Sequence, residues 1–183
     1  IYRAKGKGSF VKNPGTPERH SKKLIAFLLS CQDMNDSSLM RFMMGIQRCL
    51  SPSGYSLIVE NTEEDPETEF HFMKKHLDNR VAGFILMSAD PERSLDNYAF
   101  LRRRNIPFVL LDRRAESFPV NSVTCNNQDG AFSAVDYLIG LRHKKIGFVA
   151  EKFFLSSEKE RYEGYCRAMR SASLMPDDGL LFT

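Results

Sequence analysis

The chain has 183 residues, of which 42% are hydrophobic and 27% charged, and its formal net charge is +3. These values lie in the ordinary range of soluble globular proteins and exclude both a disordered chain and a small disulfide-held scaffold. No apolar run approaches the roughly 18 residues that span a bilayer, and the N-terminus lacks a signal-peptide core, so we expect a cytoplasmic protein.

The first 23 residues are basic. The stretch "IYRAKGKGSFV" places two short β-prone runs around a tip with two lysines and two glycines, which predicts a β-hairpin. Residues 1–23 carry seven cationic side chains against the single carboxylate of Glu18, a net +6. Such an arm suits contact with phosphates, although a solvated terminus that binds nothing has the same composition. Residues 12–22, "KNPGTPERHSK", combine two prolines with a glycine and predict an exposed linker.

The remainder of the chain alternates strands with helices. Apolar runs predict strands at 24–29, 56–60, 82–88, 107–112, 121–126 and 145–150. Helical spacing of apolar residues predicts helices at about 39–50, 63–79, 91–104, 128–141 and 157–171. This alternation predicts right-handed crossovers and a doubly wound α/β fold with a parallel sheet. In such sheets ligands bind beyond the carboxyl ends of the strands. The strand-to-helix loops of this sequence, which lie at those ends, carry hydroxyl, amide, carboxylate and guanidinium groups.

Motifs for catalysis, metals and cofactors are not found. The sequence contains no GxxxxGK[ST] loop and no GxSxG elbow, and the Gly6–Gly8 pair precedes no predicted helix. His71 and His76 are separated by about 140° around a helix, which does not suit a shared metal ion. The four cysteines have no CxxC spacing, so we expect buried thiols rather than disulfides. We therefore expect a binding protein that is not an enzyme and needs neither metal nor cofactor.

Several linked stretches resemble the LacI/GalR-type regulators. The first is "VNSVTCNNQDGAFSAVDYLIGLRHKKIGFVA", which is followed by "LSSEKERYEGYCRAM". The stretches "KLIAFLL", "GFILMSADP" and "IPFVLLDR" match earlier strands of the same fold in order. The resemblance covers residues 23–182 and implies a type I periplasmic-binding-protein-like fold, with the first lobe and the start of the second.

The hairpin sequence resembles the wing of a GntR-type winged helix. A GntR-type head fused to a LacI-type sensor is the arrangement of the arabinose repressor family (AraR). The resemblance implies a wing remnant at 1–11, the linker at 12–22 and an incomplete effector-binding domain at 23–183. It also implies that the chain is an internal part of a repressor about twice as long, and that the hairpin contacts operator DNA through Lys5, Gly6, Lys7 and Gly8.

The resemblance also implies a set of ligand-binding residues. Arg161, three before Gly164, corresponds to the family's ligand-binding arginine, although a solvated arginine paired with Glu158 or Glu163 is the alternative. Asp112 has a ligand-binding role or a capping role, and Arg113 donates to a hydroxyl or closes the mouth of the cleft. The other implied contacts are Gln32, Asp33, Asn35, Ser88, Asp90 and Asn127.

The function implied is a sugar-responsive repressor, with L-arabinose or another pentose as inducer. Effector binding closes the two lobes, changes the geometry of a homodimer and releases operator DNA. The contact between the two copies is expected to include the first helix. A sugar-binding protein of transport and an α/β enzyme of unrecognised type remain as alternatives.

Overall fold

The computed structural model describes residues 2–4, 8–10, 23–31, 37–151 and 153–182. Its centre is a five-stranded parallel sheet with the strand order β4-β3-β5-β6-β7. These strands are β3 (Leu24–Leu29), β4 (Ser56–Asn61), β5 (Gly83–Met87), β6 (Phe108–Leu111) and β7 (Ser122–Val123). Leu29 pairs with both Asn61 and Met87, so the carboxyl ends of β3, β4 and β5 lie level at one edge.

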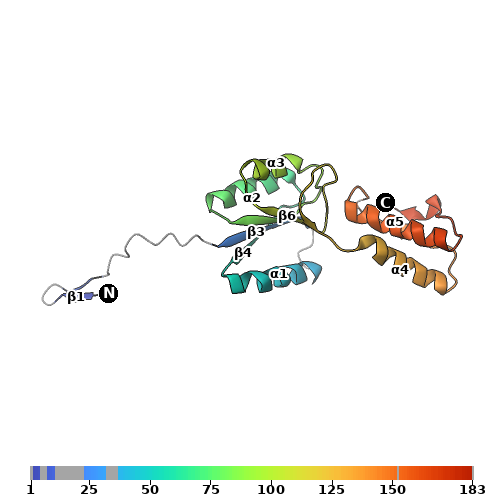
Figure 1. Cartoon of the computed structure of the whole chain (residues 1–183), viewed down its shortest axis with the longest axis horizontal. Helices are drawn as coiled ribbons and strands as arrows, with labels where there is room; N and C mark the ends of the chain where they lie inside the picture. The colour runs from blue at the N-terminus through green and yellow to red at the C-terminus, as the bar shows by residue number, and fades with distance from the viewer. Residues whose placement is uncertain (1, 5–7, 11–22, 32–36, 152, 183) are drawn as a thin grey trace.

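Helices cover both faces of this sheet (Figure 1). Helix α1 (Ser37–Leu50) packs on one face, and α2 (Pro66–Asp78) and α3 (Leu95–Arg103) pack on the other. Strand β3 shows why, because its side chains alternate between the faces: Phe27 and Leu29 join the cluster under α1, and Ala26 and Leu28 join the cluster under α2 and α3. The predicted doubly wound α/β fold is confirmed.

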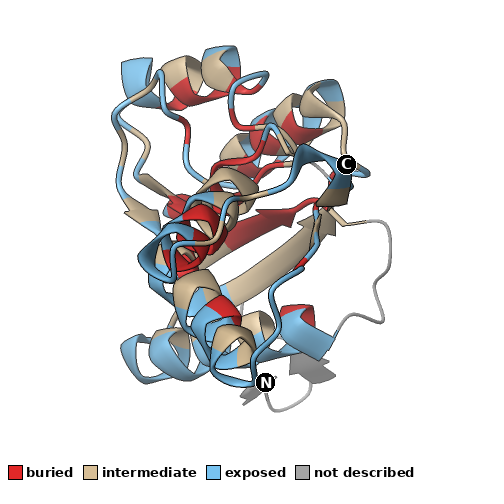
Figure 2. Cartoon of the chain, turned by 90° about the vertical axis from the view of Figure 1, so that its right-hand side faces the viewer, coloured by how far each residue is buried: buried red, intermediate tan, exposed pale blue. Residues whose placement is uncertain are grey.

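Helices α4 and α5 form a second unit beside the sheet (Figure 1). Strand β7 leads to α4 (Asn127–Gly140), followed by β8 (Phe148–Val149), α5 (Ser156–Ser171), the 3-10 turn η2 (Asp178–Leu180) and β9 (Leu181–Phe182). Strands β8 and β9 pair in parallel. This unit has its own core, which shares no residue with the two clusters of the sheet. Figure 2 shows the buried positions of the chain in red, on strands of the sheet and on helices.

The N-terminal hairpin is present. Strands β1 (Tyr2–Ala4) and β2 (Gly8–Phe10) pair antiparallel, with Ala4 opposite Gly8. Lys5, Gly6 and Lys7 at its tip lie outside the described residues, as does the predicted linker at 12–22. The assignment of this hairpin to a GntR-type wing stays a prediction.

Three local expectations differ from the structure. Helix α3 begins at Leu95 rather than Pro91, because residues 91–94 form a turn in which the Arg93 amide donates to the Asp90 carbonyl. Strands β7 and β8 are two residues each, and each pairs with one neighbour among the described strands. The expectation of buried cysteines is wrong for Cys49 and Cys125, which are exposed. Among the described residues, none of the helices combines the length and the hydropathy that a membrane-spanning segment needs.

Candidate functional site

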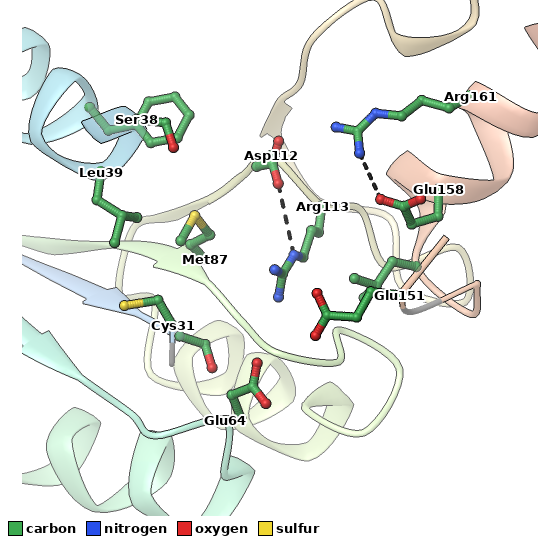
Figure 3. Close-up of a pocket in the computed structure, with 13 residues that line it drawn as sticks. Cys31, Ser38, Leu39, Glu64, Met87, Asp112, Arg113, Glu151, Glu158 and Arg161 are labelled. Carbon is green, nitrogen blue, oxygen red and sulfur yellow. Dashed lines mark hydrogen bonds and ion pairs between the residues drawn. The ribbon is translucent and has the colours of Figure 1, made fainter. Parts of the chain in front are cut away.

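A cavity of about 520 Å³ lies beyond the carboxyl ends of the central strands (Figure 3). Its described walls come from the ends of β3, β5 and β6, the loop after β4, the start of α1, and the segment from the end of β8 into α5. The apolar part of the lining includes Leu39, Phe42, Met87 and Leu155. The polar part consists of Ser30, Ser38, Glu64, Asp112, Arg113, Glu151, Glu158 and Arg161.

Asp112 directly follows β6 and projects toward this cavity (Figure 3). Its φ is +69°, in the left-handed region that few residues other than glycine, asparagine and aspartate adopt without strain. Its backbone amide donates to the carbonyl of Val123 at 2.8 Å, which holds the turn in place. This backbone geometry turns the carboxylate away from the sheet and toward the cleft.

Arg113 lies beside Asp112 and is held by two backbone carbonyl groups of the loop after β5. Its Nη1 donates to the carbonyl oxygens of Ser88 at 2.9 Å and Ala89 at 3.1 Å. Its Nε lies 3.8 Å from Oδ2 of Asp112, beyond hydrogen-bond distance, and is buried without a hydrogen-bond partner in the described structure. The hydroxyl of Ser30 is buried and unpartnered in the same way. Both atoms are covered by protein, so each is an unpaired buried polar group in the wall of the cavity, which costs about 1–3 kcal/mol.

Arg161 approaches the cavity from α5 (Figure 3). Its Nη1 donates to Oε1 of Glu158 at 2.7 Å, and its Nε donates to Oδ1 of Asn127 at 3.1 Å. The side chain remains 42% exposed, so part of the guanidinium faces the open cleft. The structure thus joins the two alternatives weighed from the sequence: Arg161 lines the cavity and also pairs with Glu158.

The comparison with protein families agrees with this arrangement. A model described as periplasmic binding proteins and the sugar-binding domain of the LacI family matches residues 23–181. The chain belongs to this family. The match begins at β3 and includes every element that lines the cavity.

Curated relatives of this LacI-type chain are transcriptional repressors. The HTH-type transcriptional repressor PurR of Aliivibrio salmonicida is 29% identical over 141 residues, which are 76% of this chain and 42% of the relative. The arabinose metabolism transcriptional repressor of Geobacillus stearothermophilus is 25% identical over 174 residues, 92% of this chain and 46% of the relative. The chain therefore spans less than half the length of these relatives.

Solved structures of LacI-type regulators share the fold. The transcription regulator CcpA of Lactococcus lactis superposes with a TM-score of 0.78 at 21% identity, covering 88% of this chain and 58% of that one. The Cra regulator of Pseudomonas putida, in complex with fructose 1-phosphate, gives a TM-score of 0.73 at 20% identity, covering 85% and 56%. At these identities the likeness concerns the fold alone.

The LacI-type cavity brings together only part of the residue set expected from the sequence. Asp112, Arg113 and Arg161 line it, whereas Ser88, Asp90 and Asn127 are not among its described lining residues. Oδ1 of Asp90 accepts the Glu92 amide at 3.0 Å and stabilises a turn. Gln32, Asp33 and Asn35 lie outside the described residues.

Ser88 instead belongs to a buried network behind the cavity. Its hydroxyl donates to Oε2 of Glu69 at 2.5 Å and accepts from the Tyr98 hydroxyl at 2.8 Å. Asn97 donates to the other oxygen of Glu69 at 2.9 Å. Burial raises the pKa of Glu69, and the hydrogen bonds from Asn97 and Ser88 offset this only in part. Ser88 can therefore support the cavity through its backbone carbonyl, which holds Arg113, while its hydroxyl is engaged elsewhere.

Five polar lining residues are absent from the set of ligand-binding residues expected from the sequence: Ser30, Ser38, Glu64, Glu151 and Glu158. Each lies in or beside a polar strand-to-helix loop, and that position is the signal in the sequence that could have found them. With Asp112 they give the described lining four carboxylates against the two guanidiniums of Arg113 and Arg161. Among the described lining residues, carboxylates therefore outnumber guanidiniums.

Proposed function

We propose that this protein is a sugar-responsive transcriptional repressor whose effector is a neutral sugar, with L-arabinose or another pentose as the first candidate. The observation that carries the proposal is the convergence of Asp112, Arg113 and Arg161 on one cavity. Planar carboxylate and guanidinium groups recognise adjacent hydroxyls by paired hydrogen bonds, and a site built in this way discriminates against analogues that lack a hydroxyl.

Charge favours a neutral sugar over a phosphorylated one. The described lining carries two more carboxylates than guanidiniums, which repels a dianionic phosphate group. The named arabinose repressor among the relatives, which aligns with 92% of this chain, supports a pentose.

The repressor role rests on the curated relatives, which are named as repressors. In the proposed mechanism the effector draws the two lobes together, the homodimer changes geometry, and paired DNA-binding heads lose their fit to a two-fold operator. Helix α1 belongs to the proposed dimer contact, because Met40 and Met44 on it are 56% and 50% exposed. The hairpin with Lys5, Gly6, Lys7 and Gly8 would approach the DNA backbone.

Calorimetric titration of the full-length protein with L-arabinose, D-xylose, D-ribose, D-galactose and fructose 1-phosphate tests the effector. We expect binding of one neutral sugar, and we expect Arg161→Ala to weaken it by about 10- to 100-fold, because charged hydrogen bonds to the sugar are lost. Arg170→Ala, which removes an exposed guanidinium from the last turn of the same helix, is the matched control and should leave the Kd unchanged.

Fluorescence anisotropy with promoter DNA from the protein's own operon tests the repressor role. The sugar that binds in the calorimeter should release that DNA. Heat with fructose 1-phosphate alone would contradict a neutral effector, and sugar binding without any effect on DNA binding would favour a solute-binding protein.

A further inference from the structure

A series of side-chain hydrogen bonds connects the unit of the central sheet, here called the first lobe, to Arg161 in the unit of α4 and α5, here called the second lobe. The residues that link the two lie outside the cavity lining. The Arg114 guanidinium, in the loop after β6, pairs with Oε1 of Glu160 on α5. The other oxygen of Glu160 accepts from Nδ2 of Asn127 at 3.0 Å, and Oδ1 of Asn127 accepts from Nε of Arg161 at 3.1 Å. Arg114 and Arg161 are thus joined by two intermediates, Glu160 and Asn127.

The chemistry of these groups fixes the orientation of the Asn127 amide. A carboxylate only accepts hydrogen bonds and a guanidinium only donates them, so the amide must turn its NH₂ toward Glu160 and its oxygen toward Arg161. Asn127 is 6% exposed and the Glu160 side chain 19%, so water competes weakly for these bonds. The rotated amide would place donor against donor and acceptor against acceptor.

A second contact ties the same loop to α5. The backbone amide of Arg114 donates to the hydroxyl of Ser156 at 2.9 Å, and Ser156 is 5% exposed. Lys159 and Glu116 also meet across the two units, but at 3.5 Å and with side chains 44% and 59% exposed, so this pair contributes little. The position of Glu160 therefore depends on how the loop after β6 lies against α5.

We propose that Glu160 and Asn127 are positioning residues that couple the direction of the Arg161 guanidinium to the contact between the two lobes. The inference rests on the proposed function, in which Arg161 binds the sugar. Closure of the lobes around a sugar would then change the contact between Arg114 and Glu160. Loss of this contact would free the Arg161 guanidinium from the orientation in which it binds the sugar. Because the link passes through groups that do not line the cavity, it sets affinity without touching the ligand.

Glu160→Gln tests the coupling, because a glutamine cannot accept from both Arg114 and Asn127. We expect the Kd of the sugar to rise by about 5- to 10-fold, and Glu160→Asp, which keeps the carboxylate, to recover part of the loss. Glu163→Gln on the same helix is the matched control: it is exposed and should leave the Kd within about twofold. In an Arg161→Ala background Glu160→Gln should have no further effect, because positioning acts only through Arg161.

Exchange of the Arg161 Nε proton, followed by NMR and assigned with Arg161→Lys, supplies a readout that needs no sugar. We expect Glu160→Gln to accelerate this exchange several-fold and Glu163→Gln to leave it unchanged. If no sugar binds the wild type but exchange accelerates in Glu160→Gln, the proposed function is wrong and the positioning role stands. Unchanged exchange of this proton in Glu160→Gln would overturn the inference. So would a loss of sugar affinity on Glu160→Gln that is equally large with Arg161 present and in the Arg161→Ala background.

Discussion

Glu69 is an ionisable side chain buried inside the first lobe. It is 1% exposed and accepts hydrogen bonds from Ser88 and Asn97, yet burial raises the pKa of its carboxyl above the usual value. A raised pKa means that the folded state binds the proton more tightly than the unfolded chain does. The stabilisation from the protonated group is complete below the unfolded pKa of about 4.5 and is lost as the pH rises through the folded pKa.

Glu69→Gln should therefore change the pH dependence of stability. We expect the unfolding free energy of the wild type, minus that of the variant, to fall as the pH rises from 4 toward 8. Urea unfolding at several pH values measures this difference. Glu67→Gln, which removes an exposed carboxylate from the same helix, supplies the baseline, and a difference for Glu69→Gln that stays constant with pH would contradict the assignment.

Ser30 and Ser88 show how far single residues could be predicted. Both directly follow a buried strand, and the Ser30 amide donates to the carbonyl of Met87, so the two are neighbours at the strand ends. The sequence located this edge but pointed to Ser88. What separates them is Glu69, which lies 19 residues from Ser88 along the chain and engages its hydroxyl. Long-range packing therefore decides which of the two serines lines the cavity, and no local pattern records it.

At the scale of elements, the type of each helix and strand followed from periodicity, while the lengths of some strands did not. Strand β3 is paired on both sides and has the bounds expected from its apolar run. Strands β7 and β8 are only two residues long, whereas the edge strand β4, which also has one partner among the described strands, keeps six residues. Pairing is a tertiary property, so an apolar run predicts that a strand exists better than it predicts where the strand ends.

The contact between α4 and α5 depends on one glycine. A Cβ added at Gly164 would lie 2.1 Å from the carbonyl oxygen of Gln128 and 3.0 Å from the side chain of Ala131. Backbone cannot move aside as a flexible side chain does, so the two helices would have to separate. The glycine three residues after Arg161 is therefore explained by packing.

Gly164→Ala should destabilise the fold by about 3 kcal/mol, at the upper end of overpacking effects. Gly45→Ala is the matched control, because a Cβ at this position in α1 meets nothing within 4 Å. It should stabilise the protein by about 0.5–1 kcal/mol through the better helix propensity of alanine. Chemical unfolding of both variants measures the difference, and a neutral Gly164→Ala would mean that α4 and α5 are farther apart than described.

At the scale of the molecule, the described residues after the N-terminal hairpin form two units with separate cores. The sheet with α1, α2 and α3 buries two clusters, and α4, α5 and β8 bury a third. The side-chain hydrogen bonds and ion pairs that join the loop after β6 to α5 involve polar groups, such as those of Arg114, Ser156 and Glu160. Both units leave apolar side chains exposed, such as Met40 and Val123 on the first and Val149 and Phe182 on the second.

This division predicts that the two units loosen independently. Met169 in α5 and Met73 in α2 are 2% and 0% exposed, each within the core of its own unit. Replacing either by alanine should cost about 2–5 kcal/mol. Because the cores share no residue, we expect Met169→Ala to speed amide hydrogen exchange in α4 and α5 while β3 and β5 keep their protection.

Met73→Ala gives the reciprocal case, with faster exchange in β3 and β5. Hydrogen exchange followed by mass spectrometry resolves both units in one experiment. If Met169→Ala loosened β3 and β5 as much as α5, the lobes would unfold as one cooperative body, and the contacts of Arg114 with Ser156 and Glu160 would transmit stability as well as orientation. If protection instead changes in one unit at a time, the polar contacts between the lobes do not hold them together as one body. These contacts can then shift when the lobes move, as ligand-driven closure requires.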